Sequence, residues 1–126
     1  MEVLKVSTEE YLEVIPHPYF AFGSVEFNRL NKTKCEELVF LLFKESRYRL
    51  GIIGGIIDGH FYSPFSAPFG GFSFVSGDVR LQYIDDAIRL LKVWIRDQGL
   101  YAATIILPPY IYDHKFIAKQ INCLWR

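Results

Sequence analysis

Three apolar runs separated by short polar turns constrain the fold of this chain most strongly. Two of them, Glu37 to Lys44 and Arg49 to Ile57, are long enough for strands, and His60 to Ser63 continues the pattern after Asp58-Gly59. Asp-Gly favours a two-residue hairpin turn, because glycine accepts the positive φ that such turns need. The segment 45–48 forms the other predicted turn. The sequence therefore predicts a three-stranded antiparallel meander.

The middle run of this meander contains three glycines, at Gly51, Gly54 and Gly55. Within a strand, glycines mark a bulge or the close approach of another backbone. A helix packed tightly above the strand explains them equally well, so both readings stay open.

Amphipathic segments on both sides of the meander predict helices. The best is Asp78 to Gln98, where apolar residues recur with helical spacing and Gly99 follows as a cap. Another helix begins at Ser7 with Glu10 in a capping box, and it ends at Pro16. The remaining predicted elements are a short helix at Ser24–Asn31, a buried strand at Tyr101–Leu107 and a helix from His114 to about Trp125 capped by Asp113.

The helical spacing also predicts which side chains face the core. In the long helix these are Ile84, Ala87, Ile88, Leu91, Trp94 and Ile95. In the last helix they are Phe116, Ile117, Ile121 and Leu124. Trp125 is expected to pack back onto the domain or to lie in an interface.

The segment Pro64 to Gly77 is unusual because it is rich in proline, glycine and phenylalanine at once. Its prolines and glycines exclude a regular element. Its phenylalanines, Phe65, Phe69, Phe72 and Phe74, are too apolar for a solvent loop. They are expected to point inward, to close a cleft or to face a partner. A ligand or partner surface formed by this loop and Tyr110 to Tyr112 is weighed evenly against core packing.

Length and composition limit the class of protein. The 126 residues, of which 51% are hydrophobic, fit a single domain spanning 1–126 with enough apolar surface to fold. Lys plus Arg and Asp plus Glu are equal at 14 each, so no basic stripe predicts nucleic-acid binding. No apolar run is long enough to predict a membrane span, and the mixed, acidic segment 1–10 does not predict a signal peptide. A cytoplasmic protein with two buried thiols, Cys35 and Cys123, is expected.

Polar residues with catalytic potential are scattered. His17, His60 and His114 lie in three different regions, so structural roles are favoured over a shared metal site. Glu36 and Glu37 are more typical of solvated strand ends than of a general base. The serines at 63, 66 and 73 lack the Gly-x-Ser-x-Gly elbow of serine hydrolases.

The predicted order is helix, helix, three antiparallel strands, long helix, strand, helix. This order resembles the GNAT fold of acyl-CoA N-acyltransferases without its closing pair of strands. The stretch Ser63 to Phe72 (SPFSAPFGGF), and Leu107-Pro108-Pro109 before a tyrosine-bearing turn, resemble segments of GNAT-like, Fem-related proteins from Bacteroides-type bacteria. The resemblance implies an α/β fold of three α/β/α layers with a mixed, mainly antiparallel sheet of about four strands. It also implies that this chain is the N-terminal half of a longer, two-lobed protein.

Coenzyme A or acetyl-CoA is the cofactor that the resemblance implies. Typical GNAT enzymes hold its pyrophosphate on a glycine-containing turn after the fourth strand and on the N-terminus of the next helix. Here a Pro-Phe-Gly-Gly loop stands in that place, and no Lys or Arg lies between Arg49 and Arg80. Asp78, at the predicted helix start, would oppose phosphate. Binding in the usual way is therefore not expected.

Two functions follow as hypotheses. The first is a GNAT-like acyl- or aminoacyl-transferase-related domain that is inactive alone. The second is a non-catalytic interaction or dimerisation module with the same fold, its open sheet edge covered by a homodimer partner or by a missing C-terminal lobe. No catalytic residue is assigned. The residues expected to line a cofactor or ligand cleft are Ser63, Phe65, Ser66, Phe69, Gly70, Gly71 and Tyr110.

Overall fold

The predicted meander lies at the centre of the fold. In this computed structural model, which describes residues 1–77 and 79–125, β2 (Glu37–Glu45), β3 (Arg47–Ile57) and β4 (His60–Ser63) pair antiparallel in chain order. Asp58 and Gly59 have φ of 49° and 74°, which confirms the predicted hairpin turn. The chain also reverses within the predicted turn at 45–48, but the turn is tighter than expected, because only Ser46, with φ of 53°, separates β2 from β3.

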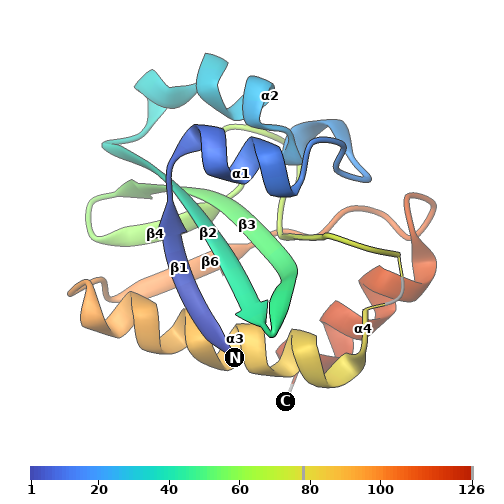
Figure 1. Cartoon of the computed structure of the whole chain (residues 1–126). Coiled ribbons are helices and arrows are strands. Elements are labelled where there is room, and N and C mark those ends of the chain that lie inside the picture. Colours follow the sequence, from blue (N-terminus) through green and yellow to red (C-terminus); the bar gives the residue numbers. More distant parts are fainter. Residues whose placement is uncertain (78, 126) are drawn as a thin grey trace.

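Three further strands extend the meander into a six-stranded sheet (Figure 1). β1 (Glu2–Val6) pairs antiparallel with β2, and β6 (Ala102–Ile105) pairs parallel with β4. β5 (Phe72–Phe74) pairs antiparallel with β3, so the prediction that 64–77 contains no regular element is wrong for these three residues. The sheet is mixed and mainly antiparallel, as predicted, but larger than the four strands expected.

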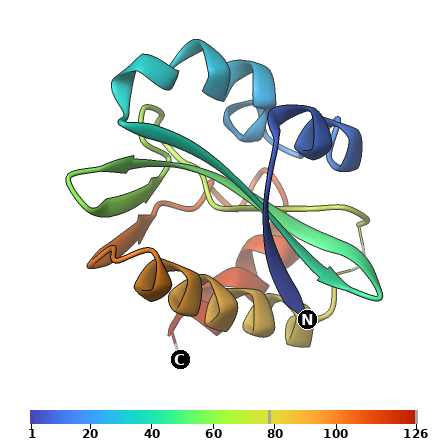
Figure 2. The ribbon, with the colours of Figure 1, turned by 60° about the vertical axis from the view of Figure 1, so that its left-hand side comes forward.

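Helices cover both faces of the sheet, which gives three layers (Figures 1 and 2). One face carries α1 (Thr8–Val14) and α2 (Val25–Leu30), and the other carries α3 (Leu81–Asp97) and α4 (His114–Trp125). Two single-turn 3-10 helices, η1 (Ala21–Gly23) and η2 (Lys32–Lys34), flank α2.

The helix starts follow the capping residues in the sequence. The Glu10 amide donates to the Ser7 hydroxyl at 3.2 Å, and the Phe116 amide donates to the Asp113 carboxylate at 3.1 Å. Both bonds satisfy amides that have no partner within their helix, which confirms the two predicted caps. Gly99, with φ of 74°, follows α3 as expected. Asp78, the predicted start of the long helix, lies outside the described residues.

The core has two parts because β2 is buried on both faces. Successive strand residues point to opposite sides, so Leu41 and Phe43 face α3, whereas Phe40 and Leu42 face α1. This explains why β2 reads as an unbroken apolar run rather than as an alternation. The larger part lies on the α3 side and contains all six α3 residues that were predicted to face inward.

The rotation of α4 about its axis differs from the prediction. Phe116 and Ile117 are buried as expected, but Ile121 and Leu124 are 41% and 38% exposed. Their places in the core are taken by the residues one position before each, Gln120 and Cys123. The α4 helix therefore turns part of its apolar surface away from the sheet.

Gly51 lies directly beneath α1. A Cβ atom there would be 2.6 Å from the Ile15 side chain and 2.7 Å from the Tyr11 ring. Of the two readings of the strand glycines, the closely packed helix is therefore correct at this position. At Gly54 and Gly55, aromatic rings from Phe61 and Phe65 occupy the space instead.

β6 is the last strand along one side of the sheet (Figure 1). The prediction that this strand is buried is wrong, because its residues are half-buried or exposed. Its length is also shorter than expected, from Ala102 to Ile105. No helix in the described part of the chain is long and apolar enough to cross a membrane.

Candidate functional site

The loop that the sequence singles out interrupts a strand. β4 and β5 pair with the same edge of β3, β4 near one end of that strand and β5 near the other. Ser63 ends β4 and Phe72 begins β5, so residues 64–71 leave the sheet and return to it. The peptide bond from Ser63 to Pro64 is cis. The loop is thus an excursion from one interrupted strand.

Ser63 closes the base of this excursion. Its hydroxyl donates to the Ile53 carbonyl at 2.8 Å and accepts from the Gly71 amide at 3.0 Å. The Ser63 carbonyl accepts from the Ile106 amide at 3.1 Å. With 1% of its surface exposed, Ser63 joins three chain segments rather than facing a ligand.

Gly70 and Gly71 also hold the base of the 64–71 excursion together. The Gly70 amide donates to the Ile106 carbonyl at 2.6 Å, and a Cβ on Gly70 would lie 2.6 Å from the backbone of Ser63. Gly71 has φ of 96°, in the region that favours glycine. These glycines therefore let the loop backbone lie close to other backbone of this chain, at Ser63 and Ile106, rather than close to a ligand.

The aromatic residues of the loop pack against other rings. Phe69 lies 5.1 Å from Phe22 and 5.1 Å from Tyr112, measured between ring centroids, and 6.0 Å from Phe20. Phe65 covers the space above Gly55. The structure thus brings Phe69 together with Tyr112 at the end of the Pro-Pro segment.

The other predicted cleft residues are farther from this cluster or less constrained. Tyr110 is 55% exposed, and Ser66 is half-buried. Neither residue makes a hydrogen bond to the described residues. A ligand contact at these positions stays a prediction.

The histidines and the paired glutamates have separate environments. His60 stacks on Tyr62, and its Nε2 lies 2.7 Å from the Thr104 hydroxyl. Glu36 accepts from the Asp58 amide at 2.5 Å, and Glu37 forms an ion pair with Lys5. Within residues 1–77 and 79–125, no three His, Cys, Asp or Glu side chains lie close enough together to hold a metal ion.

The cysteines are thiols, as predicted, although only Cys123 is buried. Burial and then the nearby Glu36 carboxylate raise the pKa of the half-buried Cys35 thiol. A raised pKa disfavours the thiolate, which is the nucleophilic form. Cys35 is therefore poorly suited to nucleophilic catalysis.

Buried polar groups that the sequence did not reveal lie around β5. The Tyr11 and Ser73 hydroxyls are neighbours, but neither makes a hydrogen bond of normal geometry to the described residues. Gln120 accepts from the Phe72 amide at 3.3 Å, while its own amide group has no partner among the described residues. Burial raises the pKa of Tyr19 to about 12 and raises the pKa of Tyr11 further. Both phenols therefore stay protonated at neutral pH and can act only as neutral groups.

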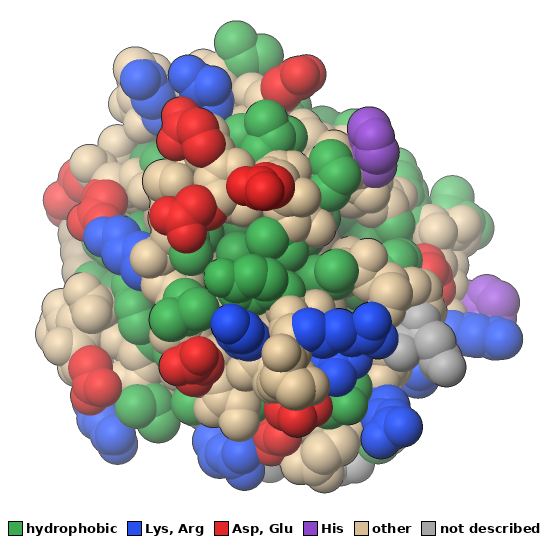
Figure 3. All heavy atoms as spheres, viewed as in Figure 1, with side chains coloured by type: hydrophobic (Ala, Val, Ile, Leu, Met, Phe, Trp, Pro, Cys, Tyr) green, Lys and Arg blue, Asp and Glu red, His purple; other side chains and the backbone are tan. Residues whose placement is uncertain are grey.

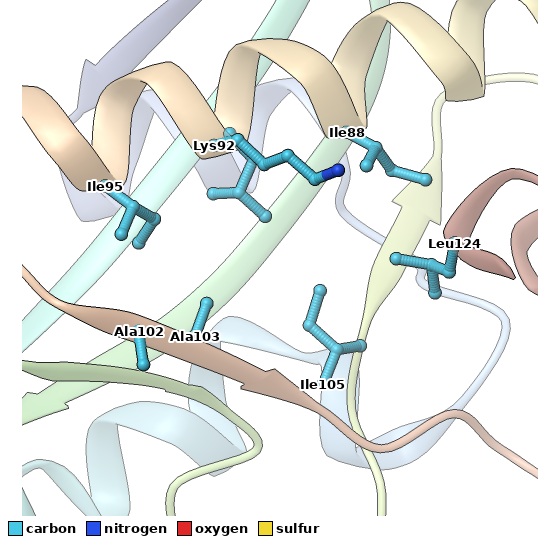
Figure 4. A pocket seen from close by; sticks show the side chains of 8 residues that line it. Ile88, Lys92, Ile95, Ala102, Ala103, Ile105 and Leu124 are labelled. Atoms are coloured by element: carbon cyan, nitrogen blue, oxygen red, sulfur yellow. The ribbon is translucent and has the colours of Figure 1, made fainter. Parts of the chain in front are cut away.

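An apolar groove of about 470 Å³ lies between α3 and β6 and reaches the end of α4 (Figure 4). Among the described residues that line it, only Lys92 carries a charge. Figure 4 shows Ile95 above Ala102 at one end of the groove and Ile88 and Leu124 toward the other, with the Lys92 side chain extending toward Ile88. The residues that line it are Ile88, Leu91, Lys92, Ile95, Ala102, Ala103, Ile105 and Leu124. None of them belongs to the cleft that the sequence predicted. The one indication of this groove in the sequence is that α4 has apolar residues beyond those buried in the core. These are Ile121 and Leu124, of which Leu124 lines the groove.

Basic side chains gather near the start of α3, although the sequence between Arg49 and Arg80 contains none. The Arg49 and Arg80 guanidinium groups lie 4.6 Å and 5.9 Å from the centre of the Tyr83 ring. Lys119 of α4 donates to the Val79 carbonyl at 2.7 Å beside a hollow that Lys115 and Asp113 also line.

Charges of both signs share the surface around this region. On the face in Figure 3, acidic side chains are most frequent over α1, and Lys and Arg are most frequent in the lower half. The fold thus brings Arg49, Arg80 and Lys119 to the start of α3, although the loop before this helix has no basic residue of its own.

Comparisons with protein families, curated proteins and solved structures found no match to this chain.

Proposed function

We propose that this chain is a GNAT-like domain that acts as a binding module, in which the β6 edge and its groove receive an extended segment of a partner polypeptide. The observation that carries the proposal is an aliphatic groove beside β6, whose outer edge pairs with no strand in the described part of the chain. Such an edge offers backbone donors and acceptors to an added strand, and neighbouring pockets accept alternate side chains of that strand.

The amount of apolar surface near β6 supports this proposal. Ile106 is 49% exposed and Leu124 is 38% exposed. Ile88, Leu91 and Ile95 form the wall of the groove on α3, each with at most 8% of its surface exposed. The predicted cleft also favours a binding module over an enzyme. Ser63, Gly70 and Gly71 use their hydrogen-bonding groups to join segments of the chain, so these groups are not free for catalysis.

A peptide selection tests the proposal. A displayed library of short random peptides is selected on the purified domain and, in parallel, on an Ala103→Lys variant. Ala103 is exposed, so the added charge blocks the groove without disturbing the core. We expect peptides with alternating apolar residues to be enriched on the unmodified domain only, and to slow amide hydrogen exchange in β6.

Equal enrichment on both proteins would refute docking at β6. Far-UV circular dichroism of the variant confirms that it is folded. Analytical ultracentrifugation of the unmodified domain shows whether a second copy already covers the edge.

A second candidate is a transferase-related domain that binds coenzyme A. Two observations favour it. The order of elements, including the unpredicted β1, agrees with a GNAT-like chain up to α4, and the parallel strands β4 and β6 are linked through α3. In addition, Arg49, Arg80 and Lys119 gather at the start of α3, where the resemblance places the pyrophosphate.

Calorimetric titration with acetyl-CoA tests this second candidate. Saturable binding that is lost in an Arg80→Gln variant would favour the transferase reading. Absence of heat at high ligand concentration would leave the binding module as the better account.

A further inference from the structure

We infer that the segment bound at β6 belongs to a different polypeptide and carries an acidic side chain that faces Lys92. This inference rests on the proposed docking function and specifies the chemistry of the partner. It follows from the charge in the groove, from the direction of the β6 side chains and from the absence of an acidic residue in β6 itself.

Lys92 is an exposed cation in an otherwise uncharged lining. Its neighbours on α3 have partners of their own, because Arg89 pairs with Asp86 at 2.6 Å and Arg96 lies 3.9 Å from Asp97. Lys92 forms no ion pair with any residue that the structure describes. When a partner covers the groove, this ammonium group loses water, and a carboxylate opposite it would offset that cost.

The side chains of β6 define which residues of an added strand enter the groove. Ala103 and Ile105 pair in register with Phe61 and Ser63 of β4. Phe61 packs against Trp94, so its register partner Ala103 faces α3 as well. Figure 4 shows the Lys92 side chain extending along the groove toward Ile88, with its nitrogen at that end. An added strand would therefore place every second side chain under α3, with apolar residues toward Ile95 and the acidic residue toward Ile88.

A second copy of this chain fits the groove less well. The β6 strand of a second copy has the sequence AATI and carries no carboxylate. Its pairing with β6 would therefore cover Lys92 without placing an opposite charge near it. The groove is thus better matched to an acidic partner strand than to itself.

Peptide selection on a Lys92→Glu variant tests the inference. Lys92 is exposed, so this variant should keep the fold. On the unmodified domain we expect selected peptides to contain Asp or Glu beside apolar positions, and on Lys92→Glu we expect Lys or Arg at that same place. A synthetic peptide chosen on the unmodified domain should bind the variant at least tenfold more weakly, and its Gln analogue should bind both proteins equally.

The outcomes separate the inference from the docking function. Alternating apolar peptides with the same residue opposite position 92 on both proteins would overturn the role of Lys92 and leave docking intact. Enrichment that the Ala103→Lys variant does not abolish would overturn docking, and the inference with it. A stable dimer of the unmodified domain whose interface includes β6 would overturn the choice of a different polypeptide.

Discussion

The Ser63 hydroxyl donates a hydrogen bond to the Ile53 carbonyl at 2.8 Å, at the point where the strand beside β3 is interrupted. In an uninterrupted ladder, a backbone amide would bond to that carbonyl. The same hydroxyl accepts from the Gly71 amide, where the chain returns to the sheet. One side chain therefore replaces backbone pairing on both sides of the excursion.

Replacing Ser63 by alanine should lower the free energy of unfolding by about 2 kcal/mol, because it leaves the Ile53 carbonyl and the Gly71 amide buried without partners. Ser73 provides a matched control, since it is equally buried at 1% exposure but its hydroxyl has no partner among the described residues. Ser73→Ala should leave stability unchanged or raise it by up to about 1 kcal/mol. Urea unfolding measures both values. Equal losses for the two serines would contradict the structural role of the Ser63 hydroxyl.

The phenylalanine cluster offers a second prediction. Phe69 packs against Phe22 and Tyr112, so Phe69→Ala should destabilise the fold by about 2 to 4 kcal/mol. Tyr110→Ala should change stability by less than about 0.5 kcal/mol, because this exposed residue has no ring contact to the described residues. Thermal unfolding of the two variants tests this contrast. A Phe69 variant of normal stability would show that the loop is not part of the core and would revive the predicted cleft.

Gly51 should not tolerate even a methyl group. A Cβ would lie 2.6 Å from Ile15, so Gly51→Ala should cost about 1 to 3 kcal/mol as α1 is pushed from the sheet. At Gly77 no described atom lies within 4 Å of the position that a Cβ would take, and Gly77→Ala should be neutral or slightly stabilising. Chemical denaturation compares the two variants. If the contact with Ile15 is the cause, Ile15→Ala should cost less in the Gly51→Ala background than in the unmodified domain.

The sequence predicted most of this fold because its local signals agree with the tertiary structure. The Asp58-Gly59 turn, the cap at Ser7 and the buried face of α3 all follow from local chemistry. β1 was missed because its apolar residues are interrupted by the charged Glu2 and Lys5. So short a strand gains its stability from pairing with β2, and that pairing is not visible locally.

The candidate site was harder to predict for two physical reasons. Ser63 and the glycines of the loop look available for a ligand until their partners are known: Ile53 lies on the neighbouring strand, and Ile106 lies far along the chain. The α4 helix has more apolar side chains than can be buried against the rest of the domain. The core accepts polar Gln120 because its oxygen bonds to the Phe72 amide, and Leu124 is left to line the groove.

Two tyrosines with buried hydroxyl groups, Tyr11 and Tyr19, predict how stability depends on pH. Burial raises the pKa of Tyr19 to about 12 and that of Tyr11 further, whereas in the unfolded chain both phenols ionise near pH ~10. Below that pH both states keep these protons, so the tyrosines cause no change. As the pH rises above it, the unfolded chain loses protons that the folded chain retains, and the free energy of unfolding falls.

Equilibrium unfolding at a series of alkaline pH values measures this fall. The Tyr19 contribution should level off near pH 12, where the folded protein also releases that proton, and the Tyr11 contribution should continue beyond it. Tyr11→Phe should make the decline shallower, because phenylalanine has no proton to lose. Tyr110→Phe serves as the control, since its ring is exposed, and should leave the profile unchanged. A Tyr11→Phe profile with the same slope as the unmodified domain would show that this phenol ionises equally in both states, contrary to its burial beneath α1 against Gly51.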